Sequence, residues 1–131
     1  MMYVLDTNTL IYFFKGMGSV ADNLLSKKPA DIGIPAIVLY ELELGIAKSA
    51  APKKRAMQLD KLIDTVQILG FSTPEAKASA QIRATLEKQG TPIGPYDTLI
   101  AGTALANQGT LVTHNTGEFE RIKKLAVEDW Y

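Results

Sequence analysis

Among its 131 residues the chain has no cysteine and only one histidine. Without thiols it can form neither disulfide bonds nor thiolate metal sites, which fits a reducing cytosol. A catalytic metal ion would therefore be of the hard kind that prefers oxygen ligands. A cysteine nucleophile is excluded, and no Ser-His-Asp arrangement is evident.

Long apolar runs and an excess of charge of either sign are also missing. No segment approaches the roughly 20 apolar residues that a membrane span needs, and the N-terminus lacks the basic and cleavable parts of a secretory signal. We therefore expect a cytoplasmic protein with no membrane partner. Because 14 basic and 14 acidic side chains cancel, binding to nucleic acid would depend on a local positive patch or on metal ions.

Strand and helix patterns alternate along the chain, without repeats or linkers. Short apolar runs between turn residues predict five strands, at 2–5, 32–34, 65–69, 110–113 and, less distinctly, 125–128. Prolines, capping residues and glycines predict helices over 36–48, 52–64, 72–89 and 95–108. The alternation predicts a single α/β domain over residues 1–131, with a short, mostly parallel sheet of four to five strands and helices on both faces.

Two aspartates are expected at the same edge of this sheet. Asp6 ends the first apolar run, and ligands of open α/β sheets bind just beyond such strand ends. Asp97 falls in the first turn of helix 95–108. Each also has a purely structural explanation, because Asp6 could cap the following helix and Asp97 could be stabilised by the helix dipole.

Further acids occupy helix 36–48 and the turn after strand 110–113. The helix is apolar nearly all round, which predicts that it is largely buried, and a carboxylate within it needs a cation or hydrogen-bond donors. The spacing does not separate Glu41 from Glu43. Glu118 follows Asn115 by three residues, which also fits a capping box. To the lone histidine, His114, we assign no catalytic role.

Taken together, these segments resemble the PIN-domain nucleases and, within them, the VapC toxins of toxin–antitoxin pairs. The resemblance covers essentially the whole chain in the same order. The segments that match are Val4-Leu5-Asp6-Thr7-Asn8, Tyr40 to Ile46, Pro95 to Ala104, Leu111 to Phe119 and Val127 to Trp130.

The resemblance implies a PIN-like three-layer fold and a set of site residues. Asp6, Glu41 and Asp97 match the core acids that hold Mg²⁺ or Mn²⁺, so Glu41 is chosen over Glu43. Many PIN domains have Asp where this chain has Asn115, and Glu118 is then expected to complete the cluster as a fourth catalytic and metal-binding acid. Polar residues that would orient these carboxylates are Thr7, Asn8, Thr113 and Asn115.

The implied activity is metal-dependent endoribonuclease cleavage of RNA. In the subgroup that this chain most resembles, the RNA is initiator tRNA, which is cut in its anticodon stem-loop. Candidates for gripping RNA phosphate are Lys48, Lys53, Lys54 and Arg55, although the last three equally fit a solvated helix start. The implied partners are a second copy of the chain and a VapB antitoxin, through which the complex would bind operator DNA.

Two other functions fit parts of the sequence. A catalytically silent PIN-like module could bind RNA or protein without cutting it. A phosphotransferase of the haloacid-dehalogenase kind also begins with Asp after an apolar strand, but it needs a second Asp two residues later, where this chain has Asn8.

Overall fold

The computed structural model describes all residues, 1–131, and contains one five-stranded sheet in which every strand is parallel to its neighbours. The strand order is β3-β2-β1-β4-β5. The strands are β1 (Tyr3–Leu5), β2 (Ile32–Pro35), β3 (Gln67–Leu69), β4 (Thr110–Val112) and β5 (Ala126–Glu128). The predicted α/β class, the parallel sheet and the helices on both faces are confirmed.

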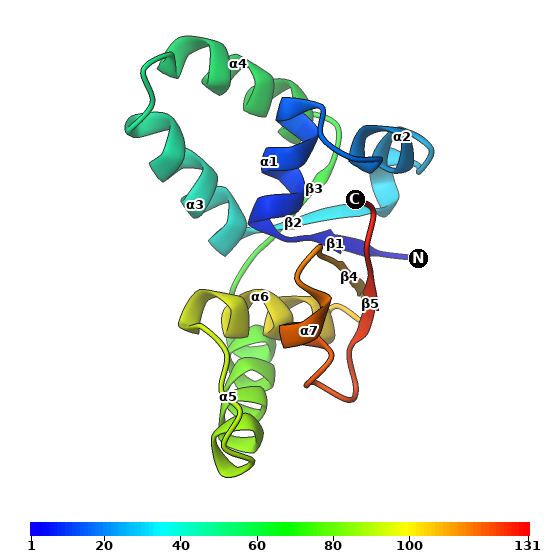
Figure 1. Cartoon of the computed structure of the whole chain (residues 1–131), viewed down its shortest axis with the longest axis vertical. Helices are drawn as coiled ribbons and strands as arrows, with labels where there is room; N and C mark the ends of the chain where they lie inside the picture. The colour runs from blue at the N-terminus through cyan, green and yellow to red at the C-terminus, as the bar shows by residue number, and fades with distance from the viewer.

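Helices cover the sheet on two sides (Figure 1). One group is α1 (Thr7–Lys15), α2 (Val20–Leu25), α3 (Ala36–Ala47) and α4 (Pro52–Ile63), with a single 3-10 turn at Pro29–Asp31. The other is α5 (Thr73–Lys88), α6 (Pro95–Ala106) and α7 (Thr116–Phe119). Right-handed crossovers explain this division, because the chain moves outward from β1 to β3 and then returns to β4 on the other side of β1.

The carboxyl ends of β1 and β4 lie at the point where the strand order reverses. Val4, Leu5, Leu111 and Val112 are fully buried there, as expected of short parallel strands covered on both faces. In sheets of this kind, the crevice beyond the carboxyl ends at the reversal point is the usual ligand site. The fold thus directs attention to Asp6, which directly follows β1.

Helix α3 differs from its prediction, since it is not largely buried. Only Val38 and Leu42 are buried, whereas Tyr40 and Leu44 are 50% and 45% exposed. The reason is that α3 contacts α1, α4, α6 and β2, and these elements leave the apolar side chains of Tyr40 and Leu44 largely uncovered. No helix is both long and apolar enough to cross a bilayer.

Candidate active site

Asp6 is held firmly at the end of β1. Its side chain is 5% exposed, and one oxygen accepts a hydrogen bond from the Thr9 backbone N–H at 2.9 Å, so that it caps α1. Burial raises the pKa of Asp6, while hydrogen bonds from Thr113 and Thr9 act in the opposite direction. The structural explanation and the functional one are therefore compatible, because a capping carboxylate still has lone pairs to offer.

Glu41 and Glu43 are clearly separated by the structure. Glu41 is half-buried, and its Oε1 accepts a hydrogen bond of 2.7 Å from the Thr7 hydroxyl across the α1–α3 contact. Glu43 is exposed and has no hydrogen-bond partner. Thr7 follows Asp6 directly, so the two carboxylates are linked through the first turn of α1.

Asp97 lies in the first turn of α6 and is half-buried. Its pKa is raised to about 6, first by burial and then by the negative charges of Glu118, Asp6 and Glu41. The charges of three acids, Asp6 after β1, Glu41 of α3 and Glu118 of α7, thus act on Asp97 at this edge of the sheet. None of the four forms an ion pair with a Lys, Arg or His side chain.

The capping box expected at Asn115 and Glu118 is not formed. The Asn115 side chain makes no capping bond to the short helix α7 and instead donates from Nδ2 to Glu118 Oε2 at 2.9 Å. The Asn115 N–H donates to the Thr113 hydroxyl, and Thr113 is close enough to Asp6 to lower the pKa of its carboxyl group. Asn8, the remaining polar candidate, is exposed and makes no side-chain hydrogen bond.

The donor chemistry of this edge fits a hard divalent cation. Carboxylate oxygens are the ligands that Mg²⁺ and Mn²⁺ prefer, and their mutual repulsion is offset here by hydroxyl and amide donors only. No three Asp, Glu or His side chains are close enough in this arrangement to share one ion.

Sequence reasoning missed Asp129, which follows β5. Its charge contributes to the raised pKa of Asp6, and its Oδ2 is 3.0 Å from His114 Nδ1. The His114 ring stacks on the C-terminal Tyr131 at 4.3 Å between ring centroids. The position of Asp129 directly after the last strand was the signal that could have identified it.

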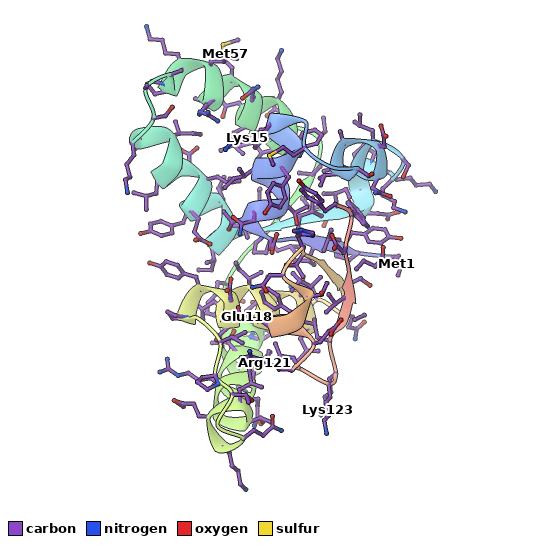
Figure 2. The ribbon with its side chains drawn as sticks, in the orientation of Figure 1. Met1, Lys15, Met57, Glu118, Arg121 and Lys123 are labelled. Carbon is purple, nitrogen blue, oxygen red and sulfur yellow. The ribbon has the colours of Figure 1, made fainter.

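The basic candidates lie on the α1–α3–α4 side of the molecule. Lys48 ends α3, and Lys53, Lys54 and Arg55 occupy the first turn of α4, all of them exposed. Only Arg55 lines a pocket, of about 420 Å³, which it shares with Lys15 of α1. Lys15 was not singled out from the sequence. Figure 2 shows it on the α1 side of the sheet, with Glu118 on the α6–α7 side.

Comparison with known proteins agrees with this geometry. Residues 3–125 match the model of the PIN domain family. A curated relative from Salmonella typhimurium, the tRNA(fMet)-specific endonuclease VapC, is 38% identical over 98% of this chain and 97% of its own length.

Solved structures show the same likeness. VapBC2 from Rickettsia felis, bound to a DNA fragment from its promoter, superposes with a TM-score of 0.91 at 38% identity over 100% of both chains. DNA-bound VapBC from Salmonella typhimurium gives a TM-score of 0.93 at 36% identity over 100% of this chain and 99% of that one. The similarity therefore extends over the entire domain.

Proposed function

Because the chain belongs to the PIN-domain family, as a VapC ribonuclease, we propose that it is a tRNA endonuclease that depends on Mg²⁺ or Mn²⁺. The proposed substrate is initiator tRNA, cut in its anticodon stem-loop, where unpaired bases can be splayed and recognised. The name of the Salmonella relative supports this substrate. Membership of the family removes the haloacid-dehalogenase alternative.

The observation that supports the proposal most directly is the state of Asp97. Its pKa is raised to about 6 by burial and by three other acids, and no basic side chain pairs with any of them. Such an arrangement costs stability in the free protein, and it is typical of sites whose charge is offset by a bound cation.

In the proposed mechanism the four acids would hold the ion, and the other polar residues would orient them. A bound Mg²⁺ or Mn²⁺ lowers the pKa of a water molecule and offsets the negative charge at the scissile phosphate. The Thr9 backbone N–H fixes Asp6, Thr7 fixes Glu41, and Asn115 fixes Glu118. Asp97 contributes fully only after it has lost its proton.

The proposed partners are a VapB-type antitoxin, through which the complex would bind operator DNA, and a second copy of the chain. The solved relatives include VapBC complexes bound to promoter DNA, which supports the antitoxin. An antitoxin Arg or Lys placed among the unpaired carboxylates would offset their charge as a cation does. A tRNA substrate places the proposed action in the cytoplasm.

The test is cleavage of total tRNA by purified, antitoxin-free protein with Mg²⁺ or Mn²⁺, compared with an EDTA control and with Asp6→Asn. Asn can still accept the Thr9 hydrogen bond, so the variant should fold and yet lose cleavage by at least about 100-fold. Asp60→Asn, which neutralises an exposed acid of α4, is the matched control and should cut normally.

Sequencing of the products identifies the tRNA and the cut position. Discrete cleavage that disappears with EDTA and in Asp6→Asn supports the proposal. If folded protein cuts no RNA with either metal, the catalytically silent binding module becomes the better description.

A further inference from the structure

His114, Tyr131 and Tyr12 form an aromatic cluster that has no part in the proposed metal site. The His114 and Tyr131 rings are stacked, with centroids 4.3 Å apart and planes inclined by 23°. Tyr12 of α1 meets both rings edge-on, with centroid distances of 5.9 Å to His114 and 5.0 Å to Tyr131. The His114 side chain is 46% exposed and Tyr131 is 42% exposed, so the stack retains surface for a ligand.

Contacts from several segments hold the two stacked rings in one arrangement. Asp129 Oδ2 is 3.0 Å from His114 Nδ1, and Asp129 Oδ1 accepts the Tyr131 backbone N–H at 2.9 Å. The Ser19 N–H donates to the Tyr131 carbonyl. A Cβ built on Gly18 would lie 2.9 Å from Tyr131 Cγ, so only a glycine lets the ring approach the chain this closely. A ligand that binds to rings fixed in this way loses little free energy to side-chain ordering.

Strand register places this stack beside the carboxylates. The last residues of β1, β4 and β5 are in register with one another, and the residues that follow them, Asp6, Thr113 and Asp129, therefore lie side by side. The ladder continues to this point, because the Asp6 N–H bonds the Val112 carbonyl and the Thr113 N–H bonds the Glu128 carbonyl. Two strand spacings separate Asp6 from Asp129, which is about 10 Å. An RNA strand with its phosphate at the carboxylates would thus pass close to the stack.

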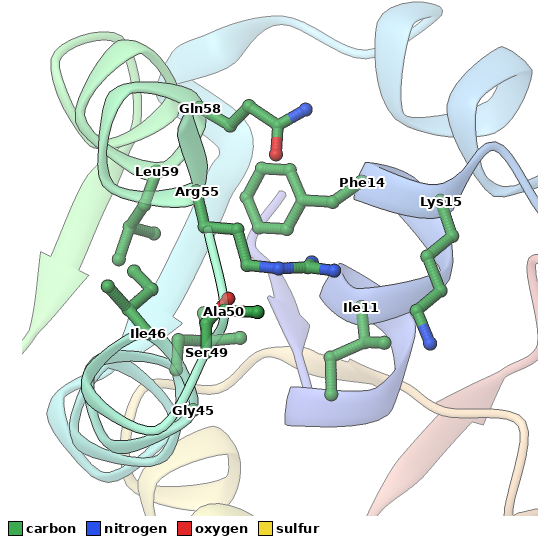
Figure 3. Close-up of a pocket in the computed structure, with 11 residues that line it drawn as sticks. Ile11, Phe14, Lys15, Gly45, Ile46, Ser49, Ala50, Arg55, Gln58 and Leu59 are labelled. Atoms are coloured by element: carbon green, nitrogen blue, oxygen red, sulfur yellow. The ribbon is translucent and has the colours of Figure 1, made fainter. Parts of the chain in front are cut away.

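The cluster is separate from the pocket of about 420 Å³ between α1, α3 and α4. Figure 3 shows Ile11, Phe14 and Lys15 of α1 at that pocket. Tyr12 does not line it and contacts His114 and Tyr131 instead. Helix α1 therefore has two differently occupied faces, and substitutions in the stack leave the pocket residues unchanged.

We propose that the His114–Tyr131 stack binds an unpaired nucleobase of the RNA substrate, next to the phosphate that is cut. The proposal rests on the proposed ribonuclease function, because it assigns a base-binding subsite to that activity. Unpaired bases of RNA loops stack on aromatic side chains, histidine and tyrosine among them. Such stacking tolerates every base, because each base has a π face. The carboxylates act on the phosphate, and the stack would select RNA in which the neighbouring base is unpaired.

Paired substitutions at the two positions separate stacking from other roles. His114→Leu and Tyr131→Leu remove a ring, whereas His114→Phe and Tyr131→Phe keep the ring and remove its polar atoms. The Phe variants are therefore matched controls at the same positions. The bonds of Tyr131 to Ser19 and Asp129 are made by its backbone, so Tyr131→Leu retains them and should fold.

The experiment measures binding of fluorescently labelled total tRNA by antitoxin-free protein in EDTA, in an Asp6→Asn background, so that no cleavage is required. Each Leu variant should weaken binding by about tenfold, and each Phe variant should bind as the parent does. Tyr131→Leu should leave the slope of log affinity against log salt unchanged, because no phosphate contact is lost. Binding of an RNA duplex without unpaired bases should be the same in all of these proteins.

Unfolding midpoints for every variant separate a lost subsite from a lost fold. Weaker tRNA binding by the Leu variants alone supports the subsite even if the parent cuts no RNA, in which case only the proposed nuclease function fails. Unchanged tRNA binding by the folded Leu variants overturns the subsite, even if the parent cuts tRNA. An equal loss in the Leu and Phe variants also overturns it, because the polar atoms and not the rings would then hold the RNA. If the Leu variants keep tRNA binding but no longer co-purify with a co-expressed antitoxin, the stack belongs to that partner instead.

Discussion

The Asp97 side chain is half-buried, and it has three acidic neighbours but no basic one. Both oppose ionisation, and together they bring its pKa to about 6. The residue therefore changes charge at a pH where the protein can be studied easily, and its titration can be followed in both stability and activity.

We expect Asp97→Asn to stabilise the metal-free protein at neutral pH but not in acid. In the wild type the folded state holds the Asp97 proton more tightly than the unfolded state does, so stability falls as pH rises from about 4 to about 6. The variant does not lose stability in this way. Its free energy of unfolding should therefore exceed that of the wild type by an amount that grows between about pH 4 and about pH 6 and then remains constant. Urea unfolding in EDTA at pH 4 and pH 7.5 measures this difference in the free energy of unfolding, with Asp60→Asn as the control. A difference that is equal at the two pH values would contradict the expectation.

The same proton should compete with the metal ion in cleavage. We expect metal-dependent activity to fall as the pH drops through about 6, because protonated Asp97 is a poor ligand. Raising the Mg²⁺ concentration should move the midpoint to lower pH, since the ion favours the ionised form. Initial rates at several pH values and two Mg²⁺ concentrations test this. If the midpoint of the pH dependence does not move with the Mg²⁺ concentration, the titrating group does not bind the metal ion.

Among individual residues, the sequence was informative where local pattern and spatial position coincide. Asp6 was assigned to a strand end because the apolar run stops there. Glu41 could not be separated from Glu43 by spacing, since the difference depends on a contact with Thr7, 34 positions away in sequence. Asp129 follows a strand as Asp6 does, but the strand at 125–128 was only weakly indicated, and Lys15 has no local pattern that marks it.

At the scale of elements, α5 and α6 approach each other unusually closely. A Cβ built on Gly102 would overlap the Ser79 side chain and would lie 2.8 Å from Ser79 Cα. The Ser79 hydroxyl is buried at this contact and has no hydrogen-bond partner. The close approach matters for the site because Asp97 occupies the first turn of α6.

Two substitutions should therefore change stability in opposite directions. Gly102→Ala should destabilise the protein by about 1–3 kcal/mol, because the added methyl group pushes the helices apart. Ser79→Ala should be neutral or stabilising by about 1 kcal/mol, because it removes an unpaired buried hydroxyl. Chemical unfolding of both variants checks the pair, and a large loss in Ser79→Ala would mean that its hydroxyl has a partner after all.

Element boundaries were predictable wherever local chemistry sets them. Helix α5 begins at Thr73, after Ser72, whose N–H and hydroxyl both donate to Glu75 Oε1 at 2.9 Å. These bonds form a capping box and lower the pKa of Glu75. The exposure of the outer face of α3 was not predictable. This face is as apolar as a face that packs in the core, and it differs only in that no other element of the chain covers it.

For the whole molecule, that outer face of α3 belongs to a larger apolar strip. Tyr40 contacts Tyr96 of α6 with ring centroids 5.8 Å apart, and Phe71 shares a groove with Pro95 and Leu99. The exposed members of the strip are Tyr40, Leu44, Phe71 and Tyr96. Contiguous exposed apolar side chains of this kind mark interaction surfaces, which supports the proposed homodimer.

Charge placed in this strip should dissociate the dimer. We expect Leu44→Asp and Phe71→Asp to sediment as monomers at concentrations where the parent is dimeric, because each buries an unpaired carboxylate in the interface. Met57→Asp, at an exposed position of α4 outside the strip, is the control and should remain dimeric. Parent protein that sediments as a monomer would contradict the proposed assembly.

The central position of β1 also bears on how the protein is made. Asp6 leaves the ribosome more than 100 residues before Val112, but its backbone N–H bonds the Val112 carbonyl. At roughly 5–20 residues per second, translation needs about 5–20 s to pass from one segment to the other. A chain released before β4 has been made therefore has no assembled carboxylate edge, and synthesis itself delays the appearance of a harmful activity until β4 and α7 exist.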